Sequence, residues 1–582
     1  MADLPEAAFA AAVAEIAAVL GQIPDARLLT AAELAVYKGR FQTGWTVPNL
    51  CADPALQLRV LLPKAAPYAV ARIAVAPAPP VLTWPHLEEL GLLCLVSDPA
   101  SVSVTAPASV VLTLLKEGRK LVNASIAGEN IQDFEDEFTT YWERWDRTKG
   151  IVRILCDPRG PSRTLAARYG SNGDYVAETE ATLHTWLANR FGKETVRKMK
   201  CWSVPLLWLP RPLRPTEYPA TISGLRSALQ EDPLRCDLLD AALLQSEPER
   251  KLIVLGTQTR RGVAFAGLQV HKLDRLQNGF RQRPPDAVIL TRYNAARTTG
   301  ARAVRFDPSW VHGRDQSPEL NMLRGKRVTL IGTGSVGSGV ADLLVKAGVG
   351  AMTCIDPEAL ASANSGRHLL GAPAAGVNKA VAVGQSLASR FPHLTMIPIP
   401  KPFGEDEQII ADLRAANLIV SLCGSWPAES LLDAVWSDDA AMPPIVYGWT
   451  EPHAAAGHAL SLRHSGGCLR CVVDEMGKMR VPVTNWPSIT LLHVPACGDL
   501  FQPYGATELM HIQALVAELA LDVLVHRVRG SAHRVWIGRR DLVARAGGTW
   551  NPAWIAAHGD PGAGGQLQDV AFAAACTVCR ST

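Results

Sequence analysis

The stretch Arg327-Val-Thr-Leu-Ile-Gly-Thr-Gly-Ser-Val-Gly337 decides the fold of the C-terminal half of this chain. Its apolar beginning predicts a buried parallel strand, and a helix over 338–347 is expected to follow. A second apolar run, 351–355, ends about 20 residues past the glycines at an acid, Asp356. Between strand and helix lies a G-x-G-x-x-G turn formed by Gly332, Gly334 and Gly337. This pattern is typical of a nucleotide-binding βαβ unit, in which the helix N-terminus faces phosphate and the acid meets a ribose hydroxyl.

The residues after the acid distinguish two kinds of nucleotide site. Asn364, Arg367 and Lys379 follow it in order. A nicotinamide site needs no such cations, because hydride transfer develops little charge at the phosphates. Attack on an α-phosphate does need them, since negative charge builds on the transferred group. We therefore expect ATP, with solvated surface charges after a dinucleotide-type turn as the alternative.

The whole block resembles the adenylation site of the ThiF/MoeB/HesA group within the ubiquitin-activating superfamily. That resemblance implies a Rossmann-like α/β adenylation domain over residues 301–582. There Asp356 binds ribose, while Asn364, Arg367 and Lys379 hold the ATP phosphates, the last two as catalytic residues. It also implies Mg2+, to which no ligand is assigned, because Gly424-Ser425 stands where many relatives have an Asp. In the lead-in segment, Arg314 is the candidate for a further phosphate contact, and an ordinary surface arginine is the alternative.

Two C-x-x-C pairs indicate a metal site in the same domain. Four thiolates suit one tetrahedral, structural Zn2+, and ThiF-type proteins place one pair within the domain and one near its end. Two separate reducible pairs are the alternative. The four expected ligands are Cys468, Cys471, Cys576 and Cys579.

Cys497 lies outside both pairs, in a Pro/Gly-rich loop before a helix expected over 508–525. A helix N-terminus after a thiol lowers the thiol pKa and favours the thiolate. Activating enzymes that form a thioester keep such a cysteine in a crossover loop, so the resemblance makes Cys497 an acyl acceptor. A structural cysteine is the alternative.

The N-terminal part, residues 1–149, shows a helix, a strand meander, a Pro-rich loop with a cysteine, and further helices. This order resembles ubiquitin-conjugating enzymes, which carry His-Pro-Asn and then a nucleophilic Cys. Here Trp84-Pro-His86 occupies the tripeptide, and Cys94 follows at the same spacing. His86 replaces the Asn that supplies an oxyanion donor, so it acts either as that donor or as a base. For Cys94 the alternative is a small buried hydrophobic residue.

Residues 150–300 carry strand-like runs but no glycine fingerprint. Activating enzymes pair an active with a degenerate adenylation fold, so we expect an inactive adenylation-like domain here, behind a linker. A compact unrelated spacer is the alternative.

Bulk properties set the class of protein. The 582 residues suffice for several domains, and a net charge of +3 gives no reason to expect nucleic acid or membrane partners. The 12 cysteines are too dispersed for a secreted disulfide framework. With no basic leader and no long apolar run, we expect a cytoplasmic protein, and the ThiF resemblance implies a homodimer.

Together these features predict a fused activating and conjugating enzyme, similar to the fusions of bacterial antiphage (CBASS-like) operons. ATP would adenylate the C-terminus of a ubiquitin-like or similarly tailed protein. Cys497 would take the acyl group as a thioester, Cys94 would receive it, and a target amine would accept it. Two alternatives are a sulfur-carrier adenylyltransferase with a non-catalytic N-terminal module, and a nucleotide-binding scaffold without activity.

Overall fold

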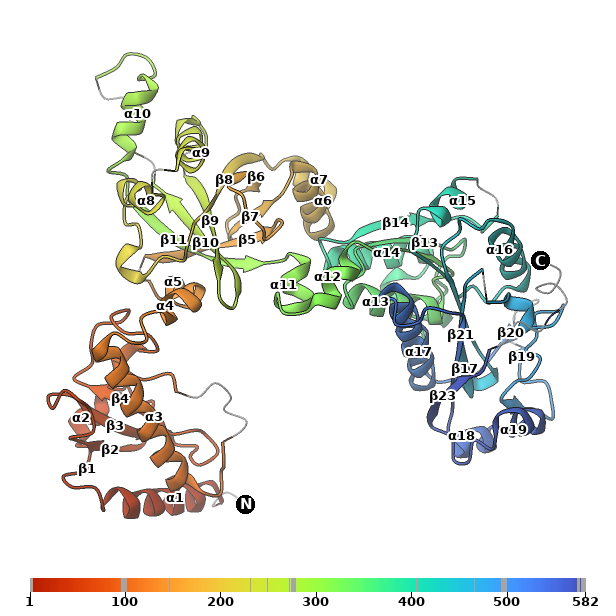
Figure 1. Ribbon diagram of the computed structural model, residues 1–582, viewed down its shortest axis with the longest axis horizontal. Coiled ribbons are helices and arrows are strands. Elements are labelled where there is room, and N and C mark those ends of the chain that lie inside the picture. The colour runs from red at the N-terminus through yellow and green to blue at the C-terminus, as the bar shows by residue number, and fades with distance from the viewer. Residues whose placement is uncertain are drawn as a thin grey trace. The chain divides into compact units, whose positions relative to one another are not determined.

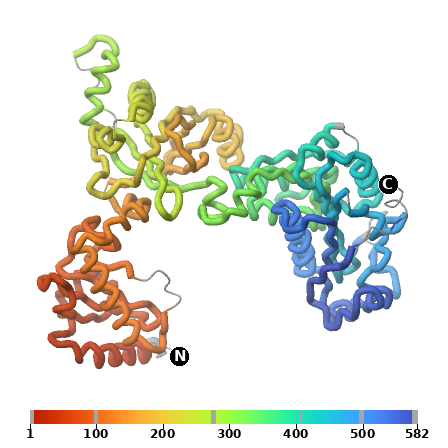
Figure 2. The backbone as a smooth tube through the Cα atoms, in the orientation of Figure 1, coloured from red at the N-terminus to blue at the C-terminus, as the bar shows by residue number. Residues whose placement is uncertain are grey.

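The computed structural model describes residues 4–95, 102–145, 147–230, 232–248, 250–271, 273, 279–404, 407–464, 466–493, 500–572 and 576. Two compact units make up the chain, and Figure 2 follows its path from red to blue. The first unit comprises Met1–Arg153, Pro158–Tyr175 and Trp202–Val304; the second comprises Ile154–Asp157, Val176–Cys201 and Arg305–Thr582.

The first unit begins with the expected helix, meander and helix (Figure 1). A four-stranded antiparallel sheet runs in the order β1 (Arg27–Leu28), β2 (Thr43–Val47), β3 (Gln57–Leu62) and β4 (Arg72–Ala76). The helices that accompany it are α1 (Leu4–Leu20), α2 (Ala31–Ala35) and α3 (Pro107–Ala127). α3 packs on β3, β4 and α1, and their apolar side chains form one core. α3 starts with Pro107 and ends at Gly128 in the left-handed conformation, as its sequence favours.

Two short helices, α4 (Asp133–Asp136) and α5 (Phe138–Arg144), follow this sheet. Their aromatic side chains are buried, and Phe138 and Trp142 contact Tyr218 from a later loop. This aromatic cluster fixes α4 and α5 between the meander and the next part of the same unit.

The middle of the chain is a closed barrel. Around it the order is β10-β11-β5-β7-β6-β8-β9. Antiparallel pairing joins β9 to β10, β10 to β11 and β6 to β8, and β8 pairs parallel with β9. The strands are β5 (Thr148–Leu155), β6 (Arg163–Arg168), β7 (Asp174–Ala177), β8 (Trp202–Trp208), β9 (Lys251–Thr259), β10 (Gly262–Val270) and β11 (Thr298–Arg305). The helices of this stretch are α6 (Glu180–Phe191), α7 (Lys193–Arg197), α8 (Ile222–Ala228), α9 (Pro233–Leu244) and α10 (Asp286–Tyr293).

The barrel corrects the expectation of an inactive adenylation-like fold at residues 150–300. An adenylation fold needs parallel strands joined by helical crossovers. Here β9 and β10 form a tight hairpin, with Thr259 paired to Gly262, which leaves no room for a crossover.

The second unit contains an eight-stranded sheet of order β14-β13-β12-β15-β16-β17-β21-β23 (Figure 1). Its first five strands in that order pair in parallel, and the last three continue it antiparallel. The strands are β12 (Arg327–Ile331), β13 (Ala351–Ile355), β14 (Thr395–Ile399), β15 (Leu418–Ser421), β16 (Ile445–Thr450), β17 (Ala456–Leu462), β21 (Ala532–Ile537) and β23 (Gln566–Val570). Strand order reverses between β12 and β15, and in open parallel sheets ligands bind beyond the strand ends at such a point.

Helices cover both faces of this sheet. α13 (Ser335–Lys346), α14 (Lys379–Arg390) and α17 (Ala506–Leu524) share one apolar cluster with the strands. α15 (Glu407–Arg414) and α16 (Trp426–Asp438) contribute to a second. The remaining helices are α11 (Pro308–Gly313), α12 (Pro318–Arg324), α18 (Arg540–Arg545) and α19 (Pro552–His558). The expected Rossmann-like α/β fold is therefore confirmed, with α13 beginning at Ser335 rather than at 338.

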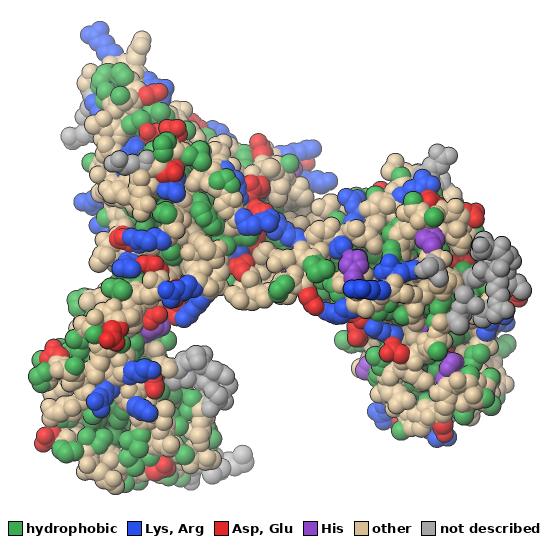
Figure 3. Space-filling view, viewed as in Figure 1, with side chains coloured by type: hydrophobic (Ala, Val, Ile, Leu, Met, Phe, Trp, Pro, Cys, Tyr) green, Lys and Arg blue, Asp and Glu red, His purple; other side chains and the backbone are tan. Residues whose placement is uncertain are grey.

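Acidic and basic side chains are intermixed on the visible face of both units (Figure 3). Among the described residues, no helix combines the length and apolarity needed to span a bilayer.

Candidate active site

The glycine turn closes tightly on itself at the end of β12. A Cβ on Gly337 would lie 1.9 Å from the carbonyl oxygen of Gly332, and one on Gly332 would lie 2.6 Å from the Cα of Cys423. Gly332 has φ +88°, whereas a Cβ on Gly334 would meet nothing within 4 Å. The turn thus presses against the end of β15 and leaves the N-terminus of α13 open to an anion.

Asp356 connects the turns that follow β12 and β13. Its carboxylate is buried and accepts hydrogen bonds from Thr333 N (2.7 Å), Thr333 Oγ1 (3.1 Å) and Glu358 N (2.9 Å). A carboxylate offers about four acceptor positions, so capacity remains for one ribose hydroxyl. The acid lies at the sheet edge where the sequence predicts it.

Lys379 opens α14 at the same edge. Its side chain is buried, and its ammonium pairs with Glu358, whose own side chain is 69% exposed. The preceding residue, Asn378, caps the helix and donates to the carbonyl oxygens of Asp356 (2.9 Å) and Glu358 (3.2 Å). Lys379 is therefore fixed in place, while its partner is an exposed carboxylate that phosphate can replace.

Arg367 holds the end of the segment that leads into α17. Its guanidinium lies 4.9 Å from the ring centroid of Phe501 and 4.6 Å from that of Tyr504. It also donates to the carbonyl oxygen of Gln502 at 3.2 Å. Tyr504 in turn contacts Ser335 through their hydroxyl groups at 3.0 Å. The segment is thus tied both to a predicted phosphate-binding residue and to the glycine turn. Cys497 itself lies outside the described residues.

Asn364 ends a short 3-10 turn, Ser362–Asn364, ahead of Arg367. Its carbonyl oxygen accepts from the N–H groups of Arg367 (3.0 Å) and His368 (2.9 Å). These contacts orient the backbone that carries Arg367.

His368 is a site residue that sequence reasoning missed. It is buried, its Nε2 donates to the carbonyl oxygen of Thr333 (2.8 Å), and its Nδ1 accepts from Leu370 N (3.1 Å). Burial lowers the pKa of His368, in keeping with this neutral tautomer. The ring braces the Arg367 segment against the glycine turn, and a lone histidine in an apolar run carries no signal of that role.

Arg314 takes part in a stack in the lead-in segment. It lies 5.1 Å from the Trp310 ring centroid, and Arg305 lies 4.9 Å from the same ring. Arg305 is buried in ion pairs with Asp307 and Asp315. The described contacts of Arg314 are with Trp310, so a role at ATP stays a prediction.

The end of β15 carries a thiol and a carboxyl in place of a Mg2+-binding Asp. Cys423 Sγ lies 3.7 Å from Glu429 Oε1 on α16. Burial raises the pKa of Glu429 to about 7, and burial with the nearby Glu429 raises that of Cys423 to about 11. Asp433 accepts a hydrogen bond from Leu469 N at 3.2 Å. Both carboxyl groups are buried and engaged in contacts within the domain, whereas Mg2+ prefers hydrated carboxylates.

Three of the four predicted zinc ligands come together. Cys576 Sγ lies 3.6 Å from the sulfur atoms of both Cys468 and Cys471, and the three sulfurs lie within 4.8 Å of one another. Cys579 lies outside the described residues. Clustered cysteine sulfurs at a turn are a donor set that suits Zn2+.

Cys94 and His86 form a pair in the first unit. Cys94 is exposed, and its N–H donates to the carbonyl oxygen of His86 at 2.9 Å. The two side chains are also hydrogen-bonded, and this bond is the largest cause of the raised pKa of His86. The alternative of a buried hydrophobic cysteine is therefore wrong, while a catalytic role stays a prediction.

Comparisons with known proteins agree with this geometry. Residues 20–150 match the model of Prokaryotic E2 family B, and residues 313–527 match the ThiF family. The chain is a fused E2-like and E1-like enzyme. Its E1-like domain carries out ATP-dependent adenylation, and the E2-like domain serves ubiquitin-like conjugation.

Two curated proteins that are similar to this chain share one name. The chain is 25% identical over 477 residues to the "ATP-dependent ubiquitin transferase-like protein Cap2" of Pseudomonas aeruginosa, covering 78% of this chain and 82% of the relative. It is 23% identical to the protein of that name from Vibrio cholerae, covering 68% and 72%. A crystal structure of E. coli MccB with ATP covers 45% of this chain and 68% of its own, at 14% identity and a TM-score of 0.30.

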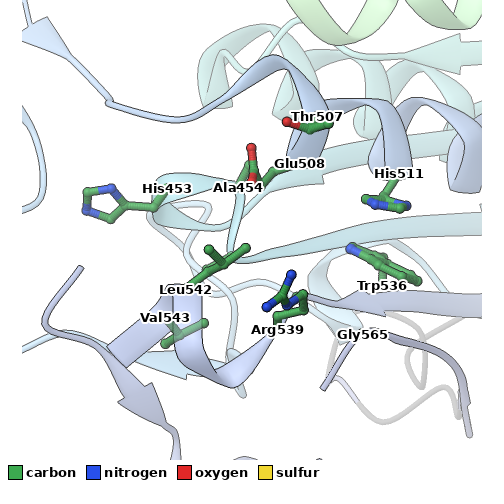
Figure 4. Close-up of a pocket in the computed structure, with 12 residues that line it drawn as sticks. His453, Ala454, Thr507, Glu508, His511, Trp536, Arg539, Leu542, Val543 and Gly565 are labelled. Atoms are coloured by element: carbon green, nitrogen blue, oxygen red, sulfur yellow. The ribbon is translucent and has the colours of Figure 1, made fainter. Parts of the chain in front are cut away.

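The E1-like domain also contains a pocket of about 460 Å³ (Figure 4). α17 contributes Thr507, Glu508 and His511, while Trp536 comes from β21. Arg539 projects toward it from below in this view. None of the residues that line it belongs to the predicted site.

Proposed function

We propose that this fusion enzyme adenylates the C-terminal carboxylate of a ubiquitin-like or similarly tailed protein and passes the acyl group through two cysteines to an amine. One observation carries the proposal. Phe501, Gln502 and Tyr504 dock on Arg367, so the described residues that follow Cys497 in the sequence lie beside a predicted phosphate-binding residue.

In the first step, a carboxylate oxygen of the tail bonds to the α-phosphorus of ATP and pyrophosphate leaves. Negative charge grows on the transferred phosphoryl group, and Arg367 and Lys379 are placed to meet it. The N-terminus of α13 adds the positive end of a helix dipole at the glycine turn. Mg2+ would bind chiefly through the phosphates and water, since the acids at the end of β15 are engaged in packing.

In the second step, the Cys497 thiolate attacks the acyl-adenylate carbonyl and AMP leaves. Thiol exchange then moves the acyl group from Cys497 to Cys94, where the E2-like site presents it to an amine, which we assign to a lysine of a target protein. The exposure of Cys94 and its bond to His86 support its role as the second acyl acceptor.

The cysteine cluster supplies a structural element. Cys468, Cys471 and Cys576 would hold zinc with Cys579 as the fourth ligand, which ties the end of the chain to the E1-like domain. A homodimer, a cytoplasmic location and a role in antiviral defence remain predictions from the family resemblance.

Non-reducing gels test the relay. The enzyme is incubated with ATP and a candidate tailed protein, and DTT-sensitive adducts are compared between wild type, Cys94→Ala and Cys497→Ala. We expect Cys94→Ala to retain an adduct on Cys497, and Cys497→Ala to form none. Normal charging of Cys94 in Cys497→Ala would contradict the two-thiol order. Product formation that continues unchanged in Cys94→Ala would point to sulfur-carrier activation instead.

A further inference from the structure

His86 of the E2-like domain is held by Tyr141 and Asp133 as well as by Cys94. Its backbone N–H donates to the hydroxyl of Tyr141 at 3.0 Å, and its carbonyl oxygen accepts from the backbone of Cys94. Its ring Nε2 lies 3.1 Å from Asp133 Oδ2. The residue has φ +58°, a left-handed conformation that non-glycine residues adopt at a cost and that surrounding contacts must maintain.

The anchors of His86 come from α4 and α5. Tyr141 is fully buried, packs edge-on against Phe134 at 4.7 Å and donates to Glu137 at 3.3 Å. In addition, Arg144 donates to the carbonyl oxygen of Leu87 at 3.2 Å. The same two helices therefore set the path of the loop and the angle of the imidazole.

Two carboxylates face the ring, but their situations differ. Glu137 lies 3.8 Å from Nδ1 of His86 and is already paired with Arg261 at 2.7 Å. Asp133, by contrast, forms its ion pair with His86, and the Asp133 side chain is 33% exposed. Both acids and the bond to Cys94 raise the pKa of His86, against the opposing effect of burial.

An oxyanion donor and a base need different surroundings. A donor to the thioester oxygen needs only an N–H in the right place, as an amide side chain supplies. A carboxylate hydrogen-bonded to one imidazole nitrogen fixes the tautomer and stabilises the imidazolium that forms when the other nitrogen takes a proton. His86 has such a carboxylate, Asp133, so its surroundings are those of a base.

We infer that His86 is the base that takes a proton from the amine attacking acyl-Cys94, and that Asp133 is the positioning residue that orients its ring. This inference rests on the proposed function. The amine nitrogen bonds to the acyl carbon, the C–S bond breaks with its electron pair on the Cys94 sulfur, and the amine proton moves to His86. Transfer of that proton to the thiolate or to water restores the pair. The two flanking carboxylates favour an acceptor that arrives as a cation, such as a lysine ammonium, which releases one proton to water before its neutral amine attacks.

A small thioester probe tests this step without ATP. Cys94 of the full-length enzyme is acylated by thiol exchange with the 2-mercaptoethanesulfonate thioester of N-acetyl-glycylglycine. Discharge to free lysine is then followed from pH 6 to 9 by mass spectrometry of the Cys94 peptide. The variants are Asp133→Asn, His86→Asn and a control, Asp136→Asn, which removes a neighbouring α4 carboxylate paired with Arg260 at 3.7 Å.

We expect Asp133→Asn to lower the limiting discharge rate about 10- to 100-fold and to move the midpoint of the rising limb to lower pH, since His86 loses a stabilising anion. Asp136→Asn should keep both values. Asn tolerates positive φ better than most residues and restores an amide donor, yet His86→Asn should discharge slowly and without that rising limb.

The inference fails if Asp133→Asn retains the wild-type pH profile, or if His86→Asn discharges at the wild-type rate, which would make residue 86 an oxyanion donor. Alkylation of Cys94 by iodoacetamide, measured in every variant, shows whether the site stays folded and the thiol reactive. If the probe charges Cys94 but ATP with a tailed protein does not, only the proposed relay fails. If neither charges it, Cys94 is not an acyl acceptor and the inference falls with the relay.

Discussion

Replacing Arg367 with alanine should release residues 500–504, which lead into α17, from the predicted nucleotide site. The guanidinium lies over two rings, each cation–π contact being worth about 0.5–1 kcal/mol at a partly exposed site. Its hydrogen bond to the Gln502 carbonyl contributes about 1.5–3 kcal/mol. Because Arg367 is only partly buried, we take about 2 kcal/mol, somewhat below the lower end of this sum, which corresponds to an opening equilibrium roughly 30-fold larger.

Hydrogen exchange of the amides at 500–505 measures this opening directly. We expect roughly 30-fold faster exchange in Arg367→Ala, together with loss of the adduct on Cys497. Arg367→Lys keeps a charge for phosphate but lacks the planar group that stacks on the rings, so it should show an intermediate rate. Arg545→Ala, at an exposed ion pair in the same domain, is the control. Unchanged exchange in Arg367→Ala would refute the view that this arginine anchors the segment.

Three further predictions concern stability. Gly337→Ala places a Cβ 1.9 Å from a carbonyl oxygen and should lower thermal stability by about 3 kcal/mol or more, whereas Gly334→Ala, with open space around its Cβ, should not; equal melting temperatures would contradict the tight turn. Cys576→Ser should remove zinc measured by elemental analysis and lower the melting temperature, while Cys236→Ser, outside the cluster, should leave both unchanged. Burial raises the folded-state pKa of Glu429 to about 7. The stability that its protonated form contributes is therefore fully present below about pH 4.5 and is lost as pH rises through 7. Glu429→Gln should remove up to about 3 kcal/mol of this pH dependence of the unfolding free energy in urea titrations, and an unaltered pH dependence would show that the carboxyl is ionised throughout.

Local signals explain why the E1-like fold could be predicted from the sequence. The glycine turn, the two apolar runs and the acid after the second run lie within one βαβ unit, so their spacing specifies it. The cysteine pairs could be matched over a long separation because ThiF-type proteins place one such pair within the domain and one near its end.

The barrel could not be predicted, because many of its strands pair across long separations and the tight β9–β10 hairpin lacks a typical turn signal. The two residues between Thr259 and Gly262 are Arg260 and Arg261, and neither is the Asn or Gly that hairpin turns usually contain. Short apolar runs without a turn signal are equally compatible with parallel and antiparallel strands. The inactive adenylation domain was therefore an inference from the family rather than from these residues.

The chemical role of His86 could not be predicted from the sequence for a similar reason. The spacing from His86 to Cys94 is local and could be read from the sequence, but the choice between donor and base depends on Asp133 and Tyr141, which reach the loop only through the fold. An Asn at this place would need no carboxylate behind it, since an amide neither gains nor loses a proton in this pH range. The presence of an acid at hydrogen-bond distance behind the imidazole is thus the feature that makes proton transfer, and not simply oxyanion stabilisation, the chemistry expected of this E2-like domain.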